Sequence, residues 1–458
     1  MQRHARRRPA LHIRKIKKKN IISKKPSEKK RVYFNLQRQH NMIDFNRKSW
    51  VKGADNSEFP IQNIPFGIYS TPHKSKRVGT AIVNQILDMQ KLVEANILSI
   101  SLDSVQIDHL NSFIALGKSV TKNVRLQIAD ILDSTNTKFQ SRPDISDFFD
   151  NMADATMHLP VRIGDYTDFY SSKDHATNVG KMFRDPANAL LPNWLHLPVG
   201  YHGRASSIVV SGTDYHRPKG QTKPTETDPP IYGPTKRMDF ELEVAFVIGK
   251  ETKLGQTIST HEAEDYIFGL CLFNDLSARD IQQWEYVPLG PFLGKNFCSV
   301  ISPWIVTIEA LEAFRVAGEK QEPKVLPYLE FEGNKNYDLS LEVGLTPENG
   351  TETIISKSNF KYMYWNMCQQ LAHHTVNGCN VRIGDMMASG TISGPQEHEF
   401  GSMLELAWKG TKPISMNDGS TRVFMNDLDT CTIRGFGERN GVKIGFGECR
   451  TKLLPAIS

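Results

Sequence analysis

Two carboxylates on one predicted strand are spaced in a way that suits a cation. Residues 238–248 alternate polar and apolar, so Glu241 and Glu243 point to one face of the strand, and Phe240 and Leu242 point to the other. Two carboxylates this close repel each other unless a cation joins them. A half-exposed strand with an acidic outer face shows the same pattern, and on spacing alone it is the commoner explanation.

Two further acids strengthen the metal hypothesis. Asp275 follows the apolar run 267–273, which is typical of a buried strand, and precedes Ser277–Asp280, a capping-box pattern. Asp168 lies in a polar cluster at residues 164–170. Four carboxylates without a His or Cys cluster favour a hard cation with oxygen ligands, Ca²⁺ or Mg²⁺.

A predicted helix after Asp275 carries groups that bind anions. Helical spacing places Arg279, Gln282 and Tyr286 on one face. Such a face could bind an anionic, oxygen-rich ligand. A solvated amphipathic helix, with Trp284 on its buried side, explains the same spacing equally well.

One histidine and one glutamate are candidates for proton transfer. His175 lies in a polar string, 171–180, that reads as a loop, and no spacing rule separates it from the other histidines. Glu405 lies in the largely apolar string 402–408. If Glu405 is buried, its carboxylate must be paired, protonated or functional.

Three common ligand motifs are absent. Gly290–Lys295 has three residues instead of four between its glycines, and Asn296 follows the lysine, so it is not a phosphate loop. The glycines of 435–441 miss the dinucleotide spacing by one residue, and Gly390–Gly394 is not Gly-x-Ser-x-Gly. The sequence therefore gives no support to ATP, NAD or serine-hydrolase chemistry.

The elements that must position these residues are mainly strands. Residues 57–160 contain short strands at 66–70 and 77–89 and helical patterns at 102–117 and 121–133. From residue 161 to the C-terminus, apolar strings at 207–211, 242–248, 339–345 and 442–447 are separated by Gly and Pro. We expect a small β-rich N-terminal domain at 57–160 and a mostly β catalytic domain at 161–458.

The first 50 residues form a segment apart. They carry 17 Lys and Arg against two acids, a charge of +15, whereas the remainder has 39 basic and 48 acidic residues. Such charge density predicts a disordered extension, while the mildly acidic body argues against nucleic acid as the main partner. The alternatives are a transit peptide, a nuclear-targeting segment, an extension without a role, or an upstream start codon with the true start at Met42.

The six cysteines and the hydropathy indicate an intracellular protein. No pair has Cys-x-x-Cys spacing, and the cysteines lie in or beside apolar strings, so we expect free buried thiols in a reducing compartment. No apolar run approaches the ~20 residues of a membrane span.

Several long strings together resemble the fumarylacetoacetase family. The resemblance runs from about Phe59 to the C-terminus and is most specific in Asp165–Ser172, Pro192–Ala205, Ser277–Gln282, Trp284–Lys295 and Ser389–Pro395. It implies an SH3-like N-terminal barrel, a larger C-terminal β-sandwich or roll, and usually a cytoplasmic homodimer. It also implies metal-assisted hydrolysis of 4-fumarylacetoacetate, a small diketo acid, to fumarate and acetoacetate, the last step of tyrosine and phenylalanine degradation.

The resemblance also implies roles for individual residues. The implied metal ligands are Asp168, Glu241, Glu243 and Asp275, with Lys295 and Ser299 near a second metal. The implied proton acceptor is His175, partnered by Glu405, and Arg279, Gln282 and Lys295 correspond to the groups that stabilise the oxyanion. The implied substrate contacts are Tyr170, Arg184, Tyr201, Gln282, Tyr286 and Thr391.

Three features depart from the family pattern. Ser299 replaces a threonine, Leu276 replaces the usual tryptophan, and the basic extension has no counterpart. A hydratase, isomerase or decarboxylase of the wider superfamily is the alternative within enzymes. A non-catalytic protein that kept the fold is the alternative outside them.

Overall fold

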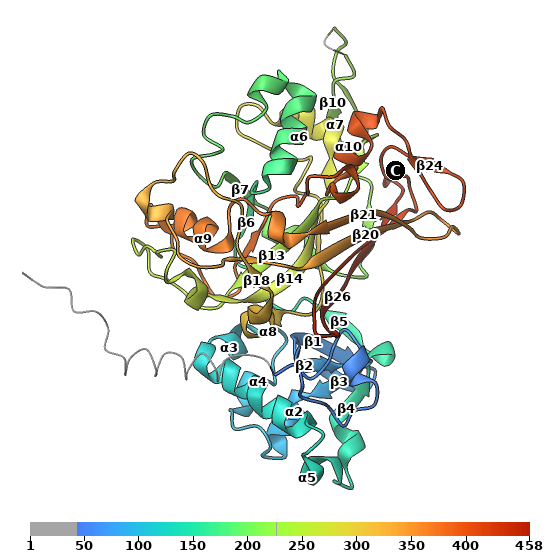
Figure 1. Cartoon of the computed structure of the whole chain (residues 1–458). Helices are drawn as coiled ribbons and strands as arrows, with labels where there is room; N and C mark the ends of the chain where they lie inside the picture. The colour runs from blue at the N-terminus through green and yellow to red at the C-terminus, as the bar shows by residue number, and fades with distance from the viewer. Residues whose placement is uncertain (1–43, 226) are drawn as a thin grey trace, which may run out of the picture. The chain divides into compact units, whose positions relative to one another are not determined.

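The computed structural model describes residues 44–458 apart from Glu226. The described residues from 44 to 458 belong to one compact unit (Figure 1). The predictions for residues 1–43, namely the basic extension, its targeting alternatives and the start at Met42, lie outside the described residues.

Residues 44–50, which we had assigned to the extension, pack on the body. Arg47 Nε donates to Asp133 Oδ2 at 2.5 Å, and Trp50 Nε1 donates to the carbonyl of Ile131 at 2.8 Å. The Trp50 ring contacts Phe139 and Phe149, with centroid distances of 6.2 and 5.9 Å. The folded part therefore begins before residue 50.

The N-terminal region is built on a five-stranded antiparallel sheet in the order β4-β3-β2-β1-β5. Its strands are β1 (Phe66–Thr71), β2 (Lys74–Ile82), β3 (Gln85–Asp88), β4 (Phe149–Asn151) and β5 (Thr156–His158). Its helices are α2 (Met89–Glu94), α3 (Asn111–Ile114), α4 (Lys118–Leu132) and α5 (Thr137–Gln140). The predicted strands at 66–70 and 77–89 are confirmed, and the short strands suit the small barrel that the resemblance implied.

One of the two predicted helices of this region differs. The helix predicted at 121–133 is α4, but 102–117 holds only turns and the short α3. The amide of Val78 in β2 donates to the carbonyl of Val105, and the amide of Leu110 donates to that of Pro160. These tertiary bonds hold the backbone out of a continuous helix, although the apolar residues still face the core.

The C-terminal region has two larger sheets. The first is eight-stranded and mixed, with the order β7-β6-β22-β13-β14-β16-β8 and β17 paired to β14. Its strands are β6 (Tyr166–Phe169), β7 (Gly200–Gly203), β8 (Ile208–Val210), β13 (Leu242–Ile248), β14 (Ile267–Asp275), β16 (Ser299–Ile301), β17 (Val306–Thr307) and β22 (Met386–Ala388). The second has the order β21-β20-β25-β26-β9, with β9 (Tyr215–His216), β20 (Ser340–Thr346), β21 (Thr353–Asn359), β25 (Thr430–Arg439) and β26 (Val442–Leu454).

Short hairpins and helices complete this region. The two-stranded pairs are β10 (Lys219–Thr222) with β11 (Ile231–Pro234), β12 (Met238–Asp239) with β15 (Ser277–Ala278), β18 (Arg315–Val316) with β19 (Asn336–Tyr337), and β23 (Ile414–Ser415) with β24 (Thr421–Arg422). The helices are α6 (Lys173–Phe183), α7 (Arg279–Glu285), α8 (Ile308–Leu311), α9 (Met367–Thr375) and α10 (Met403–Leu406). The predicted strands at 207–211, 242–248, 339–345 and 442–447 are confirmed as β8, β13, β20 and β26.

The two sheets face each other, so the prediction of a mainly β region with a sandwich or roll is confirmed. Gly435 of β25 lies against β14 so closely that a Cβ there would be 2.8 Å from Cδ2 of Leu272. Asn274 Nδ2 of β14 also approaches Cys431 Sγ of β25 at 3.7 Å. Close packing of this kind forms one core between the sheets.

The large sheet is covered on both faces. Along β13, Val244 and Phe246 enter the core between the sheets, while Ala245 and Val247 enter a core shared with the N-terminal strands. The alternative of a half-exposed acidic strand at 241–243 is therefore wrong, because every residue of β13 is buried.

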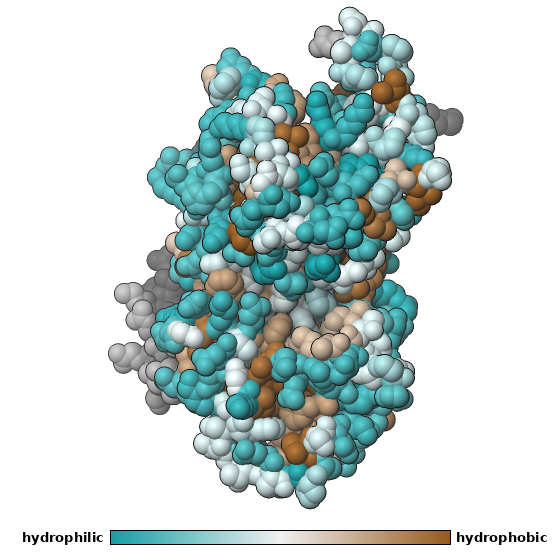
Figure 2. Space-filling model, turned by 90° about the vertical axis from the view of Figure 1, so that its right-hand side faces the viewer, coloured by the Kyte–Doolittle hydropathy of each residue, from teal (hydrophilic) through white to brown (hydrophobic). Residues whose placement is uncertain are grey.

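Figure 2 shows one face of the molecule, on which hydrophilic side chains predominate and hydrophobic ones form small groups.

The cysteines and the helices agree with part of the sequence analysis. All six cysteines are free; Cys379 is half-buried and the other five are buried. Within residues 44–458, Glu226 aside, none of the helices has the length and apolar character needed to span a membrane.

Candidate metal and catalytic centre

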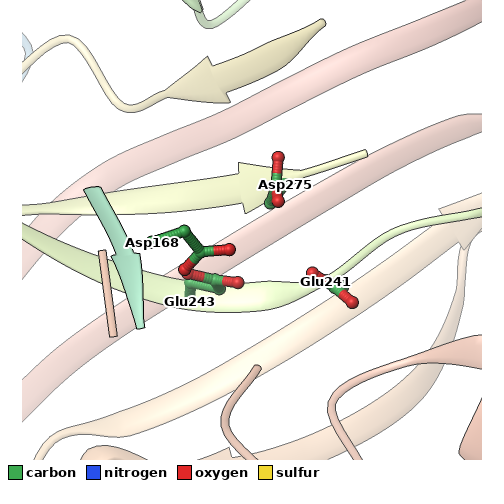
Figure 3. Close-up of side chains that lie close together, drawn as sticks. All are labelled: Asp168, Glu241, Glu243 and Asp275. Atoms are coloured by element: carbon green, nitrogen blue, oxygen red, sulfur yellow. The ribbon is translucent and has the colours of Figure 1, made fainter. Parts of the chain in front are cut away.

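Four carboxylates from three strands of the large sheet meet in the interior. Asp168 lies on β6, Glu243 on β13, Asp275 at the end of β14, and Glu241 just before β13. One oxygen of each lies within 4.8 Å of one oxygen of every other, and all four residues are buried (Figure 3). The acids singled out from the sequence are therefore brought together.

The short strand β22 explains why β6 and β13 can share this cluster. β22 pairs with both neighbours and ends at Ala388, opposite Asp168. Gly390 then turns the chain away with φ of +76°, and a Cβ there would be 2.2 Å from the carbonyl oxygen of Phe169. Only glycine fits this turn, whose amide donates to Glu243 Oε2 at 3.0 Å.

Burial and mutual repulsion make the cluster costly without a cation. Burial raises the pKa of Asp168 well above its ordinary value, and Asp275 adds to the shift. Burial and the nearby Asp168 raise the pKa of Glu243 in the same way. Asp168 Oδ1 and Glu243 Oε1 are buried without a hydrogen-bond partner. Unpartnered carboxylate oxygens and an all-oxygen donor set fit a divalent cation.

Two cations of the protein itself offset part of this charge. Lys295 Nζ contacts Glu241 Oε2 and lies 2.7 Å from Asp275 Oδ2, while Arg279 Nη1 lies 2.8 Å from Glu241 Oε1. Burial acts to raise the pKa of Glu241, but Lys295 and Arg279 outweigh it and lower that pKa to about 2. Burial acts to lower the pKa of Lys295, but Asp275 and Glu241 raise it overall, so the ammonium stays charged.

His175 and Glu405 form a buried pair beside this cluster. His175 Nδ1 lies 2.7 Å from Glu405 Oε2. The prediction that His175 lies in a loop is wrong, because the residue belongs to α6. Ser172 Oγ accepts a hydrogen bond from the His175 amide and caps the start of this helix. Of the alternatives given for a buried Glu405, namely paired, protonated or functional, the structure shows it paired with His175.

The Glu405 carboxylate is ionised and saturated with hydrogen bonds. Asn178 Nδ2 donates to Oε1 at 2.9 Å, Ser402 Oγ donates to Oε2 at 2.9 Å, and Ser393 Oγ reaches both oxygens. Burial acts to raise the pKa of Glu405, but His175 and these donors hold it below its ordinary value. Because the carboxylate only accepts, Nδ1 of His175 carries the proton and Nε2 is the basic nitrogen.

Helix α7 carries Arg279 and Gln282, but its start and its buried side differ from the prediction. Its N-cap is Ala278 without a side-chain bond, since Ser277 Oγ donates to the carbonyl of Asp275 and Asp280 accepts from the Lys236 amide. The capping box is therefore wrong. Ile281 provides the buried side of α7, whereas Trp284 is 40% exposed.

Arg279 presents one unused nitrogen. Its Nε donates to Asp239 Oδ2 at 2.8 Å, and its Nη1 faces Glu241 and Gln282. Its Nη2 is buried without a partner. A fixed guanidinium with a free donor beside the acid cluster can meet a negative oxygen on a ligand.

Two of the other predicted residues bond directly to the cluster. Tyr201 donates its hydroxyl to Asp275 Oδ2 at 2.9 Å, and Ser299 Oγ donates to Asp275 Oδ1 at 2.8 Å. The Tyr170 ring packs edge-on against His175 with a centroid distance of 5.2 Å.

Within the described residues, four further positions make no side-chain hydrogen bond or ion pair with the four carboxylates. Thr391 is buried immediately after Gly390, and Leu276 is fully buried in the core between the sheets. Arg184 Nη2 donates to the carbonyl of Ala189 at 2.6 Å. Tyr286, one residue beyond α7, is 53% exposed.

Three residues of this region were not singled out from the sequence; two of them are buried, and Asn178 is half-buried. Asp239 binds Arg279 and the first amides of α10, and Asn178 and Ser393 bind Glu405. Asp239 continues the alternation of Glu241 and Glu243 backwards by two residues, so the same pattern could have found it. Asn178 and Ser393 have no comparable signal, because their partner lies far away in the sequence.

The fold and this site correspond to a known family. The family model described as "Fumarylacetoacetate (FAA) hydrolase C-terminal" matches residues 165–454, and "Fumarylacetoacetase N-terminal" matches residues 62–160. The chain belongs to the fumarylacetoacetase family, which confirms the resemblance described above.

Several proteins similar to this chain are fumarylacetoacetases. The chain is 52% identical over 415 residues to the fumarylacetoacetase of Homo sapiens, covering 89% of this chain and 99% of the human protein. It is 51% identical over 416 residues to that of Rattus norvegicus, covering 90% of this chain and 99% of the rat protein. A solved fumarylacetoacetate hydrolase from Exiguobacterium antarcticum is 17% identical with a TM-score of 0.49, covering 86% of this chain and 99% of that chain.

Proposed function

We propose that this protein hydrolyses 4-fumarylacetoacetate to fumarate and acetoacetate, the last step of tyrosine and phenylalanine degradation. Identity near 50% to fumarylacetoacetases over nine tenths of the chain supports the reaction. The observation that carries the proposal is the buried His175–Glu405 pair beside four carboxylates, with His175 close enough to lower the pKa of Glu241.

Asp168, Glu241, Glu243 and Asp275 hold Ca²⁺ or Mg²⁺ in this proposal. When bound, the cation supplies a Lewis acid that polarises the diketo oxygens of the substrate. Lys295 and Ser299 were expected at a second metal. We limit the proposal to one cation, because these four carboxylates are the one group of three or more His, Cys, Asp or Glu side chains in the described residues that could hold an ion.

His175 is the general base. Its Nδ1–H donates to the Glu405 carboxylate, so Nε2 accepts a proton from water as the oxygen attacks a carbonyl carbon of the substrate. Glu405 stays ionised and stabilises the imidazolium. Without the Glu405 carboxylate, the imidazole ring of His175 would have no fixed tautomer.

Arg279, Gln282 and Lys295 stabilise the alkoxide that this attack forms. Arg279 Nη2 is the donor best placed for this role, because it is buried and makes no other bond. Donors that already point to the site need no reorganisation as negative charge develops. The C–C bond then breaks and the acetoacetate portion takes up a proton as it leaves.

The remaining predicted residues bind the substrate. Tyr170 and Tyr201 flank His175 and Asp275, and Thr391 follows the Gly390 turn, so these three line the reacting end. Arg184 and Tyr286 lie farther out, with Arg184 able to exchange its bond to the Ala189 carbonyl for a substrate carboxylate.

We also propose a homodimer that works in the cytoplasm. Exposed apolar side chains at Val287, Leu289 and Phe292, in the loop after α7, offer a surface for self-association. Free cysteines fit a reducing compartment. Light scattering on the purified protein tests the dimer, and a tagged chain in cells tests the compartment.

Product analysis tests the reaction. Purified protein given 4-fumarylacetoacetate should release fumarate and acetoacetate in equal amounts, measured by chromatography. A hydratase, isomerase or decarboxylase would give a hydrated, rearranged or CO₂-releasing product, and a non-catalytic relative would give none. Any of these results would refute the proposal.

A further inference from the structure

A buried carboxylate behind the site joins two of its parts. Asp239 is fully buried at the end of β12. Its Oδ2 accepts from Arg279 Nε at 2.8 Å and from the amide of Leu404 at 3.1 Å, and its Oδ1 accepts from the amide of Met403 at 2.7 Å. It has no part in the proposed proton transfer or metal binding.

These partners belong to the two halves of the proposed machinery. Met403 and Leu404 form the first turn of α10, which carries Glu405 and through it His175. Arg279 begins α7, directly after β15, whose Ser277 pairs with Asp239. The Asp239 carboxylate thus connects Arg279 to helix α10, whose Glu405 orients His175.

The amides of α10 hold Asp239 in one orientation. They occupy one lone pair on each carboxylate oxygen, so the carboxylate cannot rotate. Arg279 is then held through Nε by Asp239 and through Nη1 by Glu241, on two sides of a planar fork. The nitrogen that remains, Nη2, has no freedom to turn away and is the one without a partner.

We propose that Asp239 is a positioning residue for the oxyanion step: it sets the guanidinium plane of Arg279 so that Nη2 faces the oxygen on which negative charge develops. Asp239 does not touch the substrate. This inference rests on the proposed function and adds to it a residue that acts through Arg279.

The variant Asp239→Asn tests this role. An amide has one accepting oxygen, so it cannot bond Arg279 and both α10 amides as the carboxylate does. With Arg279 free to turn, kcat for 4-fumarylacetoacetate should fall about 10- to 100-fold, within the range for an impaired oxyanion donor, while KM changes less than about threefold. Calcium affinity, measured by calorimetry, should stay within about threefold of wild type.

A double variant that also carries Arg279→Ala distinguishes a positioning role of Asp239 from a general effect on the structure. Asp239→Asn should add less than about a twofold loss of kcat to that of Arg279→Ala, since the residue through which it acts is already gone. Losses that multiply would overturn the proposal. Asp429→Asn is the matched control, because Asp429 is also fully buried, accepts from Arg422 at 2.8 and 2.9 Å, and binds the Asn426 amide. Its kcat should change less than about twofold.

Arg279→Lys tests the same geometry if Asp239→Asn does not fold. Lysine keeps the charge near Asp239 and Glu241, but its single nitrogen replaces a rigid fork of three, so no donor is held at the position of Nη2. Its kcat should fall to within about threefold of Arg279→Ala at an unchanged melting temperature. A lysine variant with nearly wild-type kcat would overturn the inference. Wild-type protein without hydrolysis would instead refute the proposed function.

Discussion

His175 Nδ1 lies 2.7 Å from Glu405 Oε2, although the two residues are 230 positions apart in the sequence. α6 supplies the histidine and α10 supplies the glutamate. The contact fixes both the tautomer and the direction of the imidazole ring, which is what a general base requires.

Replacing His175 by alanine should therefore lower kcat and leave KM nearly unchanged. The acid cluster and Arg279 do not bond to the imidazole, so substrate still binds, while the loss of a positioned base costs ~10² to 10⁴ in rate. Steady-state kinetics and a melting curve on one preparation measure both. His261→Ala, at an exposed histidine, is the control. A normal kcat in His175→Ala would exclude His175 as the base.

The variant Glu405→Gln should show a pH-dependent loss of stability. The pKa of Glu405 lies below its ordinary 4.5, because His175 and the surrounding donors outweigh burial. A carboxylate whose pKa is lowered by folding contributes stability above its ordinary pKa and loses it as the pH falls through the folded value. The difference in melting temperature between wild type and variant should shrink as the pH falls below 4.5. A difference that keeps growing below pH 4.5 contradicts this assignment.

The variant Glu241→Gln should weaken metal binding more than it alters folding. Glutamine keeps the size but removes a charged ligand, so we expect calcium affinity to fall at least about tenfold by calorimetry. Glu264→Gln is a matched control, since Glu264 also faces one arginine and one lysine, Arg315 at 2.7 Å and Lys335 at 3.0 Å. Both variants should lose similar stability. Equal metal affinity in the two would show that Glu241 is not a ligand.

Two truncations should differ in stability. Removal of residues 1–43 should leave the melting temperature and kcat unchanged, because the proposed catalytic and metal-binding residues all follow this segment and its dense positive charge disfavours packing into a core. Removal of residues 1–52 also deletes Arg47 and Trp50, which bond and pack against residues 130–149. Loss of a packed tryptophan costs ~3 kcal/mol or more. Equal melting temperatures for the two truncations would contradict this docking.

Alternation and turn residues predicted several of the longer strands of the C-terminal region, such as β13, β20 and β26, because side chains of a strand must alternate between two faces. The same rule misjudged residues 241–243, where both faces are covered and polar side chains point inward to one another. Local sequence does not report whether a second sheet or an N-terminal domain covers a face. That information lies in long-range packing.

The errors at α6 and α7 have related causes. His175 looked like a loop residue because its string is polar, yet Ser172 caps a helix there that buries the histidine against Glu405. On α7, Ile281 faces the core, whereas Trp284 is 40% exposed and its Nε1 donates to Gln221 Oε1 at 3.4 Å. The roles of His175 and Arg184 came from the family resemblance alone, as no spacing distinguishes them.

The most direct test of a metal-dependent hydrolase is fumarate release by one preparation before and after metal removal. Fumarate is measured with the protein as purified, after chelation with elemental analysis to confirm metal-free protein, and after addition of Ca²⁺ or Mg²⁺. We expect activity to vanish on chelation and return with one of the two cations, because Asp168, Glu241, Glu243 and Asp275 form the buried site. Full fumarate release by verified metal-free protein would contradict the account.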